Sequence, residues 1–104
     1  MLGLMQQHPL LLSSIITHAA RHHPRAEVVS KLPEGGLHRT DYATVERRAR
    51  RLARVLEGPL GVRMGDRVAT MAWNGYRHLE LYYAISGMGA VCHTVNPRLA
   101  PEDI

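Results

Sequence analysis

Seven histidines raise the question of a metal site. His18 and His22 are four residues apart and would share one face of a helix, with His23 directly after them. No third ligand follows at a spacing typical of a zinc site, and Pro24 would end the helix at once. We therefore expect these histidines to lie in solvent at a helix end, near the negative end of the helix dipole, and we predict no metal ligand.

Cys92 and His93 place a nucleophile next to a base. Both fall in a predicted strand, where adjacent residues point to opposite faces, so the two side chains should not cooperate. We interpret Cys92 as a buried structural residue. Because it is the only cysteine, no internal disulfide can form, which favours a reducing, cytoplasmic location.

The glycines and the single lysine do not form a phosphate-binding loop. Such a loop needs a glycine-rich turn that ends in Gly-Lys-Ser/Thr, whereas Lys31 is followed by Leu32 and Pro33. Gly87-Met88-Gly89 comes at the end of a predicted helix, not between a strand and a helix start, and therefore reads as a helix stop.

The densest group of polar and aromatic side chains is Trp73, Asn74, Gly75, Tyr76, Arg77 and His78. It follows a predicted strand, at the edge where open α/β sheets bind ligands. The structural interpretation is a helix start capped by Asn74, with the indole of Trp73 packed in the interior. We favour that interpretation, and these residues alone identify no catalytic residue.

Arginine dominates the positive charge of the chain. The net charge is +4, and twelve of the thirteen basic residues are arginines, five of them between Arg47 and Arg54. A basic balance is typical of proteins that bind nucleic acid or an anionic surface. However, this stretch lacks the residues that read bases, so we expect a solvated helix face and no nucleic acid. A small interaction domain that docks an acidic partner or nucleic acid through this helix remains the alternative.

Hydrophobic periodicity predicts alternating helices and strands. We expect helices over residues 9–22, about 41–57 and about 75–88, a hairpin of strands 26–32 and 37–39 around Gly35-Gly36, and strands 67–73 and 90–95. Pro9 should start the first helix, and Thr40 should cap the second. The second helix carries the clearest apolar stripe, formed by Tyr42, Val45, Ala49, Leu52 and Leu56.

The order strand, helix, strand with short connections predicts a βαβ unit, and the fold class is therefore α/β. The near-continuous apolar strands suggest a sheet covered on both faces. One βαβ unit and a hairpin leave sheet edges unprotected. Pro101-Glu102-Asp103 also has the composition of a first helical turn. We expect residues 1–104 to be an incomplete N-terminal portion of a larger domain.

Four stretches together resemble the AMP-forming acyl-CoA synthetases of the adenylate-forming superfamily, most closely the medium- and long-chain fatty-acyl-CoA ligases. They are Thr40-Asp41-Tyr42 before the arginine-rich helix, the Leu-Gly-Val-Arg-Met-Gly-Asp-Arg-Val-Ala run at 60–69, the helix and strand at 73–91, and residues 93–104. The resemblance covers about residues 9–104. Each stretch is moderately specific, and their order makes the match strong.

The resemblance implies an enzyme in which ATP and a fatty acid form an acyl-adenylate and pyrophosphate, after which coenzyme A displaces AMP; Mg²⁺ offsets phosphate charge. The family's phosphate loop, adenine-binding motifs and catalytic lysine would lie beyond Ile104. Hence we assign no catalytic, cofactor-binding or metal residue here, and we expect the chain alone to be inactive and to bind none of these ligands tightly. The resemblance also suggests a homodimer in which the first helix takes part. No apolar run is long enough to span a membrane.

Overall fold

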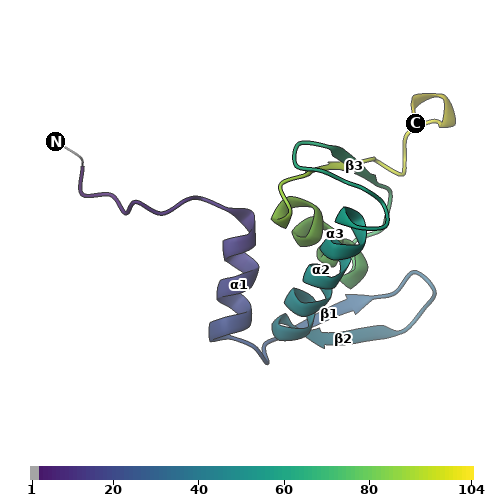
Figure 1. Cartoon of the computed structure of the whole chain (residues 1–104). Coiled ribbons are helices and arrows are strands. Elements are labelled where there is room, and N and C mark those ends of the chain that lie inside the picture. The colour runs from purple at the N-terminus through teal and green to yellow at the C-terminus, as the bar shows by residue number, and fades with distance from the viewer. Residues whose placement is uncertain (1–2) are drawn as a thin grey trace.

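The computed structural model describes residues 3–104, so the first two residues of the predicted 1–104 unit lie outside the described part (Figure 1). The elements are α1 (Leu12–His22), β1 (Glu27–Lys31), β2 (Leu37–Asp41), α2 (Tyr42–Glu57), β3 (Arg67–Thr70), α3 (Tyr76–Gly87), β4 (Val91–Thr94) and a 3-10 turn (Pro101–Asp103). The predicted α/β class is confirmed. Residues 3–11, before α1, extend away from the body as an arm (Figure 1).

The predicted hairpin is confirmed. β1 and β2 pair antiparallel, with Val29 opposite Arg39, as a two-stranded sheet. Gly35 and Gly36 have φ angles of 100° and 82°, a backbone region that favours glycine, and this allows the chain to reverse between the strands.

The predicted βαβ unit is also confirmed. β3 and β4 pair in parallel, with Val68 opposite Cys92, and α3 forms the crossover between them. β3 ends at Thr70, three residues earlier than expected, because β4 offers strand partners only as far as Thr94. The last hydrogen bond between the two segments runs from Val95 N–H to Thr70 O. Within residues 3–104, α3 covers one face of this sheet and Val91 remains 50% exposed, so the expected cover on both faces stays a prediction.

Three predicted helix starts are wrong by one to three residues, each for a local reason. α1 begins at Leu12 rather than Pro9, because residues 9–11 form a turn in which Leu11 N–H donates to Pro9 O. Thr40 and Asp41 both pair with β1, and Asp41, the last residue of β2, caps α2 by accepting from Thr44 N–H at 2.8 Å. The first backbone acceptor of α3 is Gly75 O, which makes Gly75 rather than Asn74 the cap.

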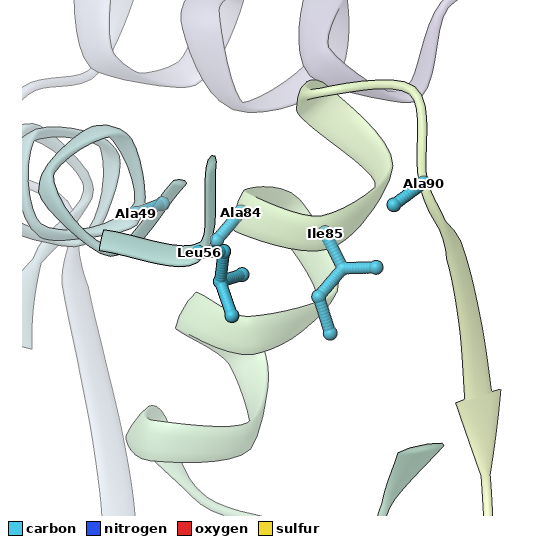
Figure 2. Close-up of a cluster of buried hydrophobic side chains, with 5 residues drawn as sticks. All are labelled: Ala49, Leu56, Ala84, Ile85 and Ala90. Atoms are coloured by element: carbon cyan, nitrogen blue, oxygen red, sulfur yellow. The ribbon is translucent and has the colours of Figure 1, made fainter. Parts of the chain in front are cut away.

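The core lies where α2, α3 and the start of β4 meet. Figure 2 shows its five buried side chains, which are Ala49, Leu56, Ala84, Ile85 and Ala90. The small alanines let α2 and α3 approach closely, and the fully buried Ile85 fills the space toward β4. Most of the predicted α2 stripe is confirmed, although Leu52 and Tyr42 are only half-buried.

α1 packs beside α2 and α3 and buries one residue, Ile16. Its other predicted stripe residues lie toward solvent or at the edge of the contact, with Leu11 and Ile15 both exposed. Across residues 3–104, no helix combines the length and the apolar character that crossing a bilayer requires.

Candidate functional site

The polar and aromatic cluster predicted after a strand lies where β3 leads into α3. β3 ends at Thr70, and the first turn of α3 carries His78. Thr70 Oγ1 and His78 Nε2 are 2.9 Å apart, and both residues are buried. Burial of two polar groups is favourable only when they pair, so this hydrogen bond fixes the imidazole between strand and helix.

The second nitrogen of this buried imidazole has no protein partner. The ring of His78 stacks on Tyr82 with centroids 4.5 Å apart, and its Nδ1 makes no hydrogen bond within residues 3–104. A catalytic histidine is normally oriented by a carboxylate and paired with a nucleophile. Here the contacts supply only the hydroxyl of Thr70, which suits a positioning role within the fold.

An outer layer attaches the start of α3 to the hairpin. Tyr76 stacks on His38 of β2 with ring centroids 3.7 Å apart, and Arg77 lies 4.9 Å over the Tyr76 ring. Arg77 Nη2 also donates to Glu34 Oε1 at 2.9 Å. This charged hydrogen bond lowers the pKa of Glu34 and raises the pKa of Arg77.

A groove of about 350 Å³ runs between β1 and the start of α3. Ser30 and Lys31 line it from β1, and Asn74 and Gly75 line it from the loop before α3. Asn74 therefore lies at a groove instead of capping the helix. The expected packing of Trp73 is also wrong, because this residue, beyond the end of β3, is 62% exposed.

A buried carboxylate on α3 was not predicted from the sequence. Glu80 is 5% exposed and accepts from Arg48 Nε of α2 at 2.6 Å. This hydrogen bond raises the pKa of Arg48. Glu80 lies four residues before Ala84 and therefore shares its face of α3. A charged residue on a buried helix face was the sequence signal that could have identified this carboxylate.

The other candidate residues remain apart. The rings of His18 and His22 are tilted against each other with centroids 4.4 Å apart, and both residues are exposed with His23, as predicted. Within residues 3–104, no three His, Cys, Asp or Glu side chains gather as a metal site would require. Cys92 is half-buried rather than buried, and the adjacent His93 is exposed. The arginines of α2 form the exposed face that the sequence predicts.

The sequence model of the AMP-binding enzyme family matches residues 16–104. The chain is 51% identical over its whole length to a 3-methylmercaptopropionyl-CoA ligase of Ruegeria lacuscaerulensis. It is 53% identical over 100 residues, 96% of its length, to a long-chain-fatty-acid–CoA ligase of Thermus thermophilus. A solved fatty acyl CoA synthetase of Mycobacterium tuberculosis superposes with a TM-score of 0.72 and 32% identity over 85% of the chain.

The chain spans about a fifth of the relatives that it matches. It covers 19% of the Ruegeria protein, 18% of the Thermus protein and 17% of the mycobacterial structure. The alternative interpretation, a docking domain for an acidic partner or nucleic acid, finds no support in these proteins.

Proposed function

The chain belongs to the AMP-binding enzyme family, and from that premise we propose that residues 1–104 are the N-terminal portion of an AMP-forming ligase that joins medium- or long-chain fatty acids to coenzyme A. Its relatives are ligases that form different acyl-CoA thioesters, and the identities above 50% extend over nearly the whole chain. That extent of identity to acyl-CoA ligases is the observation that carries the proposal.

The exposed face of the β3–β4 sheet supports a role as part of a larger domain. Val91 on β4, together with Met71 and Trp73 after β3, is at least half exposed. Parallel strands are normally covered on both faces, because their crossover helices bury one face and further elements bury the other. We propose that other segments of the ligase domain cover this face.

In the proposed reaction, the fatty-acid carboxylate attacks the α-phosphorus of ATP and pyrophosphate leaves, which gives the acyl-adenylate. The thiol of coenzyme A then attacks the acyl carbon, and AMP leaves as the thioester forms. No three His, Cys, Asp or Glu side chains gather within residues 3–104, so we assign no Mg²⁺ ligand to this chain and derive no step through the metal. This chain contributes the packed α2–α3 layer and the β3–β4 strands on which the remainder of the domain would be built.

AMP release tests the proposal. The purified 104-residue chain, incubated with ATP, Mg²⁺, coenzyme A and a fatty acid, should release no AMP. A polypeptide that continues the reading frame beyond Ile104 should release AMP only when the fatty acid is present. Turnover by the short chain would refute its expected inactivity, and a longer polypeptide without fatty-acid-dependent AMP release would refute the ligase assignment.

We also propose that the enzyme is a cytoplasmic homodimer. The arm before α1 carries Leu4, Met5 and Leu10 with their side chains in solvent, and the adjacent Ile15 of α1 is exposed as well. Such an apolar arm is suited to pack against a second copy. Light scattering should report a dimer, and Leu10→Asp should shift it to a monomer, while Leu60→Asp, at an exposed site outside the arm, should not. The single cysteine supports the reducing compartment.

A further inference from the structure

A second groove, between α2 and α3, collects positive charge. Its volume is about 400 Å³, and its lining comprises Arg48, Arg51 and Leu52 of α2 with Arg77, Glu80 and Leu81 of α3. Of the three arginines in this lining, Arg48 pairs with Glu80 and Arg77 pairs with Glu34, so the charge of Arg51 is the one left without a carboxylate partner among residues 3–104. Arg48 and Arg51 come from the arginine-rich stretch of α2, and the packing of α3 against α2 adds Arg77 to the same groove.

Glu80 holds one of these arginines in place. Its carboxylate is buried, whereas the side chain of Arg48 is 51% exposed, and the 2.6 Å bond joins Glu80 to Nε only. A buried carboxylate costs free energy unless it is paired, so the pair is maintained in the folded chain. Both terminal amino groups of Arg48 remain available to a ligand, since no other acceptor binds this guanidinium within residues 3–104.

Arg77 is also restrained, while Arg51 carries uncompensated charge. The contacts of Arg77 with the Tyr76 ring and with Glu34 limit its rotamers and use only Nη2 as a donor. Arg51 has no carboxylate within ion-pairing distance among the described residues. Because Arg48 and Arg77 are already restrained, an anion that binds them loses less side-chain entropy in ordering them. The unneutralised charge of Arg51 adds electrostatic attraction for the anion.

We propose that this groove binds a small organic molecule through a phosphate group. Guanidinium donors match phosphate oxygens in a planar, two-bond geometry, and a phosphate anion suits the unneutralised charge of Arg51. Leu52 and Leu81 provide an apolar wall for the organic part, and the groove volume lies in the range of small-molecule sites. This site is separate from the proposed ligase activity and does not depend on it.

Titration of the 104-residue chain with phenyl phosphate tests the proposal, with inorganic phosphate as the probe for the phosphate group alone. Calorimetry should show saturable binding of one phenyl phosphate, weakened by added NaCl, with lower affinity for inorganic phosphate. The Nε–Hε nuclear magnetic resonance signal of Arg48 should shift on binding. Arg51→Ala should weaken binding about tenfold, as expected for the loss of one charged hydrogen-bonding partner.

Arg47→Ala is the matched control, because Arg47 is exposed on the same helix but lies outside the groove lining. Its affinity for phenyl phosphate should equal that of the original chain. Absence of saturable binding, or equal losses in the Arg51 and Arg47 variants, would overturn the proposal. Equal affinity for the two phosphate probes would overturn the organic part, and tighter binding of a glutamate-rich peptide would assign the groove to an acidic protein instead.

Discussion

Ile85→Val removes one methylene from the best-buried position of the core. Ile85 has no exposed surface and packs between α2 and the start of β4 (Figure 2). Transfer of a methylene out of water is worth about 0.8 kcal/mol, and the small cavity left behind adds to the loss. We expect the free energy of unfolding to fall by about 1 kcal/mol, within the usual 0.5–1.5 kcal/mol for this change.

Urea unfolding followed by circular dichroism measures this loss. With a urea dependence of about 1–3 kcal/mol per M for a small protein, the midpoint should fall by roughly 0.3–1 M. Ile15→Val is the matched control, because it makes the same change in a helix at a residue that is 56% exposed. It should alter stability by less than about 0.5 kcal/mol. Equal losses in the two variants would refute the placement of the core between α2 and α3.

Four further outcomes are expected. Leu52→Ala would cost roughly 2–5 kcal/mol if Leu52 were fully buried, but because it is half-buried we expect about 1–2 kcal/mol in urea melts. Glu80→Gln should lower the free energy of unfolding by about 1–3 kcal/mol, because it weakens the charged hydrogen bond of a buried side chain. The control Glu57→Gln, at an exposed residue, should have little effect on stability. The hydrogen bond from Thr44 lowers the pKa of Asp41 in the folded chain. The ionised carboxylate therefore stabilises the folded chain above the unfolded pKa of about 4, and this stabilisation is lost as the pH falls through the lower folded pKa. Urea midpoints of Asp41→Asn should lack that part of the acid dependence. Fluorescence of Trp73, the only tryptophan, should be quenched readily by acrylamide in this chain and be protected in a polypeptide that continues beyond Ile104.

The type and order of the elements could be predicted because each has a strong local signal. The stripe of Val45, Ala49 and Leu56 recurs on the period of a helix, and the reversal at Gly35 and Gly36 separates two short strands. The helix starts were less accurate, because neighbouring residues can both be of a capping type. Thr40 and Asp41 both pair with β1, and Asp41 is the cap because its carboxylate accepts from Thr44 N–H.

The side-chain contacts around α3 depend on packing between distant segments. Glu80 and Arg48 are 32 residues apart, and their pairing follows from how α2 crosses α3. The hydrogen bond of Thr70 to His78 likewise requires the strand to end beside the helix start. Trp73 was expected in the interior because it ends an apolar run, but that run continues beyond the last residue paired with β4. The assignment of no catalytic residue to this chain stays a prediction.

The central position of α3 determines how the molecule should open. This helix contacts α1, α2, β1, β3 and β4, whereas α1 packs mainly against α2 and α3 (Figure 1). Removal of α3 would therefore separate the hairpin from the parallel strands, whereas β2 would keep its own contact with α2. Amide protons in the middle of α3 should exchange with deuterium only through global unfolding, those of α1 should exchange through a smaller local opening, and those of the arm should exchange almost freely.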